Sequence, residues 1–214
     1  MKLLSEISQA FPAQLPLLWG WILYALFHSL TASTGCKEFL RRRWPVLFSR
    51  YRLLYNLLAL LLLAPLMAMM LHTPGPQLWT WTGISAWVLN GIVGLALLSF
   101  MRRGGGYDMM AFFGVHKAAS IDKPRLVISD WHRFIRHPWY SLALLLIWTR
   151  DMSAATFISA EAITMYFVIG SRFEERKLVA EFGERYRSYQ RKVPRLFPLP
   201  GRVLSKEDAK KLCD

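Results

Sequence analysis

The sequence contains few cysteines, few acidic residues and few charged residues of any kind. Its only cysteines are Cys36 and Cys213, in separate polar segments, which excludes a disulfide framework and a cysteine-based zinc site. It has 14 Asp and Glu against 27 Lys and Arg, so the net charge is +13. Charged residues make up 19% of the 214 residues and hydrophobic residues 54%, whereas about a quarter of an ordinary soluble domain is charged. This composition excludes a disordered basic tail.

The spacing of the basic residues and of the histidines disfavours two kinds of ligand. The basic residues stand in blocks between long uncharged stretches. A nucleic-acid-binding domain instead spreads them over a globular surface, so no nucleic-acid partner is expected. His132 and His137 lie five residues apart, with Asp130 nearby. That spacing matches neither one helix face nor the usual zinc patterns, and we expect no metal.

Four apolar runs without Lys or Arg are long enough, as helices, to cross a hydrocarbon core of about 30 Å. They cover residues 11–30, 53–71, 78–101 and 152–170. A fifth run, 138–149, would span only about 18 Å. It either begins earlier, in the basic segment before it, or forms a short hairpin with the next run, with Arg150 and Asp151 in the turn. The sequence predicts an all-α integral membrane protein with about five membrane helices, the last two a hairpin, followed by a cytoplasmic amphipathic helix at 178–189.

The loop charges predict the orientation, because Lys and Arg near membrane helices stay on the cytoplasmic side. Six of the 27 lie between the first two long runs, seven between the third and the hairpin, and twelve after residue 170. Lys2 and Arg150 remain, and the connection at 72–77 is short and uncharged. We therefore expect a multi-pass protein of the bacterial inner membrane, with its N-terminus outside and its C-terminus cytoplasmic. We expect the first run to be a retained anchor, because its positive cluster follows the apolar stretch.

The first polar cluster of interest is Arg136-His137-Pro138-Trp139-Tyr140. Pro138 favours a helix start, which places Arg136 and His137 beside the positive end of the helix dipole, where an anion can bind. The alternative is that both are interfacial residues, with Trp139 and Tyr140 as part of an aromatic belt.

A second cluster, Arg172-Phe173-Glu174-Glu175-Arg176, directly follows the last long apolar run. A carboxylate pair is unusual in a protein whose membrane interfaces are otherwise basic. The alternative is an ion-paired helix end, in which Arg172 and Arg176 hold the two glutamates.

Glu161 lies midway along the last long run. An ionisable side chain there costs about 2.5–3.5 kcal/mol and is a candidate for function. Glu175 follows fourteen residues later, within about 40° of the same helix face if the helix is straight. The alternative is a protonated Glu161 that bonds a neighbouring helix through Asn90 or Thr164.

Together, these motifs resemble the isoprenylcysteine carboxyl methyltransferase family. The resemblance rests on Arg136 to Tyr140, the hairpin, Glu174 to Leu178, Phe182-Gly183, Tyr186, Tyr189 and Val193-Pro194-Arg195-Leu196-Phe197-Pro198. It covers residues 113–198, about 40% of the chain. The wider group includes membrane phospholipid and small-thiol methyltransferases and NnrU-like proteins. The segments 27–30 and 51–56 look closer to the last two kinds. Ser141 stands near where many relatives have glycine, a departure expected to narrow or reshape the cofactor pocket.

The resemblance implies an S-adenosylmethionine site at the cytoplasmic membrane surface. His137, Tyr140 and Glu174 match cofactor-contacting positions, and Arg136 and Glu175 match positions assigned to catalysis. The implied acceptor is a lipophilic or small membrane-permeant thiol, carboxylate or amine that arrives from the bilayer lipids.

The resemblance also suggests a division of the chain and leaves two other functions open. We expect an N-terminal three-helix membrane region at 1–101 and a cofactor-binding region at 102–214. One alternative function is a non-catalytic NnrU-like membrane protein with the same fold. The other is an NADPH-dependent reductase like the sterol reductases, which share a similar C-terminal region.

Overall fold

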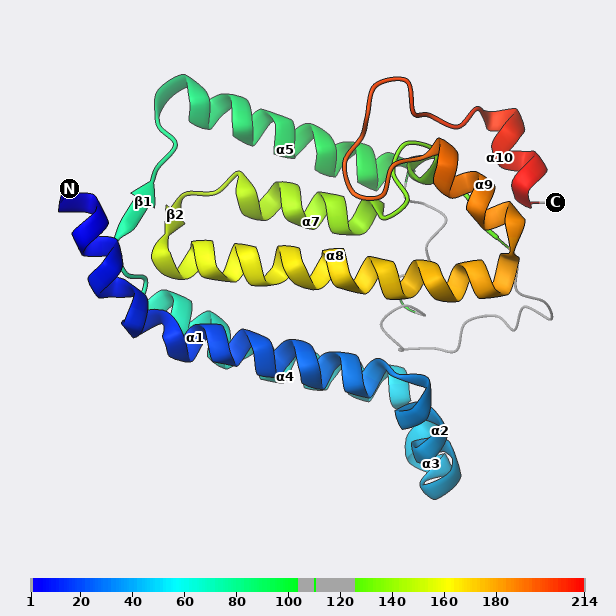
Figure 1. Ribbon diagram of the computed structural model, residues 1–214, viewed down its shortest axis with the longest axis horizontal. Helices are drawn as coiled ribbons and strands as arrows, with labels where there is room; N and C mark the ends of the chain where they lie inside the picture. The colour runs from blue at the N-terminus through cyan, green and yellow to red at the C-terminus, as the bar shows by residue number, and fades with distance from the viewer. Residues whose placement is uncertain (1, 104–109, 111–125, 214) are drawn as a thin grey trace. The chain divides into compact units, whose positions relative to one another are not determined.

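The structure, a computed structural model, describes residues 2–103, 110 and 126–213 and is built almost entirely of helices (Figure 1). The helices are α1 (Lys2–Ala32), α2 (Thr34–Arg43), α3 (Pro45–Phe48), α4 (Tyr51–His72), α5 (Gly83–Arg103), α7 (Pro138–Trp148), α8 (Ala154–Phe182), α9 (Glu184–Lys192) and α10 (Lys206–Cys213). A 3₁₀ turn covers Trp131–Arg133, and two short strands are β1 (Gln77–Trp79) and β2 (Met152–Ser153). Residues 113–125, which include three basic residues of the predicted connector, lie outside the described residues.

Among the described residues, four helices are long and apolar enough to cross a membrane: Pro12–Ala32 of α1, α4, Gly83–Arg102 of α5, and α8. Large apolar side chains lie exposed along them, such as Leu61 and Trp87, as expected of surfaces that face lipid. The fifth predicted helix, α7, has 11 residues, or about 16 Å, and does not cross by itself. The all-α membrane fold is confirmed, with four helices of spanning length and one shorter apolar helix among the described residues.

The third long helix begins later than its apolar run. Pro74, Gly75 (φ +69°) and Pro76 end α4, because proline lacks an amide donor and glycine readily adopts positive φ. β1 then pairs antiparallel with β2, with Gln77 opposite Ser153. This pairing brings the α4–α5 connection next to the segment that precedes α8.

The chain forms two compact units, of which the first contains residues 2–80, 110 and 151–163 among those described. In it, α1 and α4 run side by side (Figure 1). A Cβ on Gly20 would lie 2.5 Å from the Leu66 side chain, so the two helices approach closely because residue 20 is glycine. Trp21 Nε1 donates to Ser159 Oγ at 2.8 Å and ties α1 to the start of α8.

The second unit contains residues 81–103, 126–150 and 164–213 among those described. α5 lies beside α7, and α7 lies beside α8, where Trp148 Nε1 donates to Thr164 Oγ1 at 3.0 Å. The α7–α8 hairpin, with Arg150 and Asp151 in its turn, is as predicted. A separate hydrophobic core lies in this unit, where α9 and α10 pack together. Its buried members are Leu126, Tyr186, Tyr189, Val193, Leu204 and Ala209.

Helix α8 continues without a break through the charged cluster. Its 29 residues measure about 43 Å, more than a hydrocarbon core needs. The apolar part ends near Gly170 and charges begin at Arg172. Glu161 lies exposed on this helix, whereas Thr164, one of the partners suggested for it, accepts the bond from Trp148.

The predicted amphipathic helix at 178–189 is wrong in one respect, because two helices share it. α8 ends at Phe182 and α9 begins at Glu184, with Gly183 between them at φ +60° and ψ −131°. Residues with a Cβ rarely adopt that conformation. The glycine therefore turns the chain, and α9 packs Tyr186 and Tyr189 into the core.

Candidate active site

The start of α7 is held by a segment almost sixty residues further along the chain. Pro138 occupies the first turn of α7, where its missing amide donor costs nothing. The backbone N–H of Arg136 donates to Pro194 O at 2.9 Å, and that of His137 donates to Arg195 O at 3.1 Å. The first polar cluster thus lies against residues 193–196.

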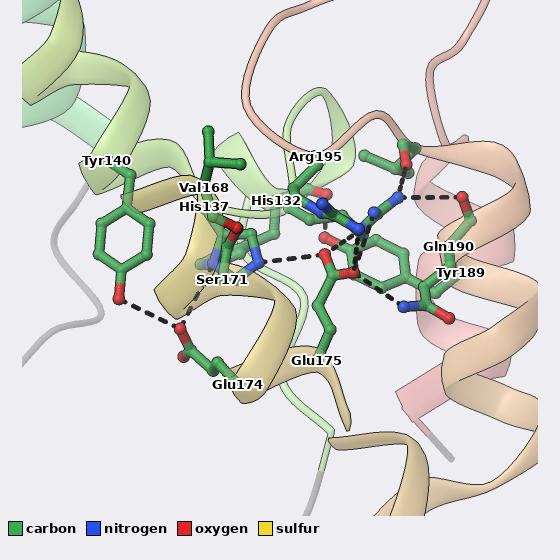
Figure 2. A network of polar contacts seen from close by, with 12 residues as sticks. His132, His137, Tyr140, Val168, Ser171, Glu174, Glu175, Tyr189, Gln190 and Arg195 are labelled. Atoms are coloured by element: carbon green, nitrogen blue, oxygen red, sulfur yellow. Dashed lines mark hydrogen bonds and ion pairs between the residues drawn. The ribbon is translucent and has the colours of Figure 1, made fainter. Parts of the chain in front are cut away.

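The two adjacent glutamates of α8 have different surroundings (Figure 2). Successive residues of a helix point about 100° apart. Glu175 turns inward and is 3% exposed, whereas the Glu174 side chain is 50% exposed. The cluster therefore combines one buried and one accessible carboxylate.

Glu175 is the centre of a network of donors (Figure 2). Its Oε1 accepts from Arg136 Nε at 2.7 Å and lies 3.1 Å from His137 Nε2. Its Oε2 accepts from Arg136 Nη2 at 3.2 Å and Gln190 Nε2 at 2.9 Å, and it lies 3.3 Å from Arg195 Nη2. The buried charge is thus compensated by donors from three parts of the chain, which offsets the cost of its burial.

These contacts shift the pKa values of three groups in the network. Burial alone would raise the pKa of Glu175, but hydrogen bonds from His137 and Arg136 hold it at about 2. Burial lowers the pKa of His137, yet hydrogen bonds to Glu174 and Glu175 outweigh it and the net shift is upward. The hydrogen bond with His137 lowers the pKa of Glu174 despite burial. Both carboxylates are therefore ionised at neutral pH.

Arg136 uses most of its donors within the protein. Its Nη1 donates to Gln190 O at 3.0 Å and to Val193 O, in addition to the fork on Glu175. Four of its five N–H groups therefore donate hydrogen bonds to protein acceptors, and the side chain is 8% exposed. Among the described residues, one Nη2 N–H has no acceptor. The predicted catalytic roles of Arg136 and Glu175 stay predictions.

Glu174 lies beside a stack of aromatic rings. Tyr140 donates its hydroxyl to Glu174 Oε2 at 3.2 Å, and His137 Nδ1 lies 3.5 Å from the same oxygen. The Tyr140 ring is parallel to that of His137, with centroids 5.3 Å apart, and to that of Phe167 at 4.6 Å. The three residues predicted to contact the cofactor are thus brought together, with Glu174 Oε1 unoccupied by any described residue.

Ser141 contacts the same C-terminal segment. Its hydroxyl donates to Leu196 O at 2.5 Å, a bond that glycine cannot make. The predicted effect of Ser141 on a cofactor pocket remains a prediction.

Sequence reasoning did not assign roles to Gln190 and Arg195. Arg195 belongs to a quoted motif, so a signal existed, but the motif did not show which residue its side chain meets. Gln190 carried no signal, because an isolated glutamine on a polar helix is ordinary.

Comparison with known proteins identifies relatives over most of the chain. The methanethiol S-methyltransferase 2 of Bradyrhizobium diazoefficiens is 32% identical over 183 residues, which cover 82% of this chain and 70% of the relative. The chain belongs to the methanethiol S-methyltransferase family. The Pseudomonas deceptionensis member is 28% identical over 194 residues, covering 82% of this chain and 69% of its own. The Mycobacterium tuberculosis member is 29% identical over 217 residues, covering 92% and 82%.

Membership in the methanethiol S-methyltransferase family confirms the resemblance seen in the sequence. No family model matches the chain, and no solved structure matches it. The relatives are methyltransferases by name, and the chain has four helices of membrane-spanning length. The protein is therefore a membrane methyltransferase, in agreement with the predicted enzyme class rather than the reductase alternative.

Proposed function

We propose that this protein transfers a methyl group from S-adenosylmethionine to a small membrane-permeant thiol. The observation that carries the proposal is the arrangement of Glu174 beside Tyr140 and His137, a half-exposed carboxylate held in place by two donors. The relatives are named for methanethiol, which favours a small thiol over a prenylcysteine carboxylate or a lipid amine.

The residues present fit this cofactor. The free oxygen of Glu174 can accept from ribose hydroxyls or an ammonium group in a charge-assisted hydrogen bond. The aromatic rings of His137 and Tyr140 are of the kind that attract a sulfonium by cation–π interaction. S-adenosylmethionine supplies a methyl group on a sulfonium, which a nucleophile displaces in line.

On the acceptor side, the requirements are alignment, exclusion of water and an ionised nucleophile. The thiolate is the reactive form of a thiol, and neighbouring positive charge favours it. Arg136 retains one Nη2 donor for this purpose, while its other donors fix Glu175 and the carbonyls of Gln190 and Val193. We propose that Arg136 and Glu175 contribute mainly by positioning.

We also propose the orientation of the chain in the bacterial inner membrane. Most basic residues lie between the first two long helices, before α7, and after Gly170, which supports a cytoplasmic site and an external N-terminus. The β1–β2 pairing supports an external location for both the α4–α5 connection and the segment that precedes α8.

Titration calorimetry and a product assay test the function. We expect purified protein to bind S-adenosylhomocysteine and not NADPH. With S-adenosylmethionine and methanethiol, we expect dimethyl sulfide in the headspace, at a higher kcat/KM than for a prenylcysteine or an aminophospholipid. Binding of NADPH alone would support a reductase, and cofactor binding with no product from any acceptor would support a non-catalytic protein.

A further inference from the structure

Arg195 differs from Arg136 in how far its donors are satisfied. Its Nη2 lies 3.3 Å from Glu175 Oε2, at the outer edge of the network, and its side chain is 33% exposed. Its Nε is buried and has no hydrogen-bond partner among the described residues. Arg136, by contrast, is buried and directs four of its five N–H groups. Of the two arginines in the network, Arg195 is therefore the one whose N–H groups are mostly unsatisfied by the described residues.

An unpaired buried donor on a charged group needs an explanation, because leaving it unsatisfied costs more than for a neutral group. Three other buried side-chain atoms of the described residues have no partner: Gln14 Oε1, Trp79 Nε1 and Trp131 Nε1. All three belong to neutral side chains. Of these four unpaired atoms, Arg195 Nε is the one that belongs to a cationic side chain and to a residue that contacts the candidate site.

The position of Arg195 indicates which anion it would hold. The His137 backbone N–H donates to Arg195 O, and the His137 ring approaches Glu174. His137 thus contacts both the accessible carboxylate of Glu174 and the backbone of Arg195, whose partly satisfied guanidinium lies at Glu175, the residue next to Glu174. A zwitterion that carries an ammonium and a carboxylate complements this pair.

We propose that Arg195 binds the carboxylate of the amino-acid end of the methyl donor, as a subsite complementary to Glu174. The inference rests on the proposed use of S-adenosylmethionine. A carboxylate is permanently anionic at neutral pH, whereas a thiol carries charge only after it loses its proton, so the fixed guanidinium suits the former better. Arg195 offers a planar fork of donors that matches a carboxylate.

Two ligands separate this subsite from the rest of the cofactor site. S-adenosylhomocysteine carries the amino-acid end, whereas 5′-methylthioadenosine keeps the nucleoside and the thioether and lacks that end. We expect Arg195→Gln to weaken S-adenosylhomocysteine binding about 10- to 100-fold, the scale of a charged hydrogen bond. Binding of 5′-methylthioadenosine should change less than about twofold. Calorimetry on purified full-length protein measures both.

Arg191→Gln is the matched control. Arg191 lies on α9, is exposed and contacts Ser188 and Glu184, so its loss removes the same charge without touching the network. We expect both affinities to stay at the wild-type level. If Arg195→Gln does not fold, Arg195→Lys replaces it, because lysine keeps the charge but lacks the planar fork of donors. Arg195→Lys should weaken binding of S-adenosylhomocysteine but not of 5′-methylthioadenosine.

The outcomes distinguish the two proposals. Wild-type protein that binds neither ligand contradicts the proposed function itself. Equal losses for the two ligands, or none for S-adenosylhomocysteine, contradict the Arg195 subsite alone. An unchanged cofactor affinity with a raised KM for the thiol would move Arg195 to the acceptor and overturn the inference.

Discussion

Arg136 and Glu175, 39 residues apart in the chain, form a two-pronged ion pair with N–O distances of 2.7 and 3.2 Å. Their side chains are 8% and 4% exposed. Removing one partner of a buried pair leaves an uncompensated charge and costs about 3–5 kcal/mol. The pair therefore joins the start of α7 to the end of α8, and the other Arg136 donors extend this link to residues 190–193.

The first prediction concerns the fork of Arg136. Arg136→Lys keeps the charge but cannot reach Glu175 and the two carbonyls together, so we expect a loss of about 1–3 kcal/mol of stability, as for one or two charged hydrogen bonds. Methyl transfer should fall by two or more orders of magnitude, while S-adenosylhomocysteine affinity falls much less. Thermal unfolding, calorimetry and kinetics measure the three quantities. Equal losses in affinity and rate would place Arg136 on the cofactor instead.

Glu174 provides a direct test of the cofactor site. Glu174→Gln preserves size and removes the charge, so S-adenosylhomocysteine affinity should fall about 10- to 100-fold. The half-exposed position makes a folding defect small by comparison. Glu184→Gln, an exposed residue on α9, is the control and should bind normally. Unchanged binding in the Glu174 variant would show that this carboxylate does not hold the cofactor.

His132 makes the second unit sensitive to acid. Burial, and then the charge of His137, lower the pKa of His132 from 6.5 to about 4. Below pH 6.5 the unfolded chain takes up a proton that the folded protein does not, so stability falls as the pH drops from 6.5 to about 4. The shift corresponds to about 3 kcal/mol.

Thermal unfolding across this window tests the assignment. Glu175 has a pKa of about 2 in the folded protein, so its own stabilising contribution begins to fall only near the ordinary pKa of a glutamate, about 4.3, and the slopes are compared above pH 5. We expect His132→Gln to flatten the pH dependence, whereas the same change at His72, exposed at the end of α4, should leave it unaltered. An equally steep loss in the His132 variant would assign the effect to other groups.

We predict that stability requires glycine at residue 183 because of its backbone conformation alone, and not because a side chain there would clash. No atom of the described residues lies within 4 Å of a Cβ built there, so Gly183→Ala adds no clash with them but strains φ +60°, at about 1–3 kcal/mol. Gly170→Ala is the control, because residue 170 is helical and its Cβ would also meet nothing. That change should be neutral or stabilise by up to about 1 kcal/mol. A similar melting temperature for both variants would contradict the strain argument.

Reporter fusions test the orientation. A reporter fused after Asp214 should be active only as a cytoplasmic one, and a reporter inserted after the exposed Thr80 only as an external one. Thr80 follows β1, so the insertion leaves the β1–β2 pairing in place. The opposite result at either position would overturn the proposed orientation.

Features that depend on local sequence were predicted well. The four long apolar runs became four helices of spanning length, because run length and the absence of charge decide whether a helix can cross. The hairpin turn at Arg150 and Asp151 also follows from neighbouring residues. The start of α5 was missed by five residues, since β1 owes its form to pairing with β2, more than seventy residues later.

By itself, the sequence determined the membrane helices and the position of the polar clusters, because each depends on spacing along one element, whereas the five candidate residues were assigned from the family resemblance of their motifs. Only the tertiary structure decided that Glu175 is buried while Glu174 is accessible. It also decided that most N–H groups of Arg136 donate hydrogen bonds within the protein, whereas Arg195 keeps a buried N–H group without a partner among the described residues. These properties depend on where residues 190–196 pack against α7. Burial and donor satisfaction are set by neighbours distant in sequence, and no local pattern encodes which of them meet.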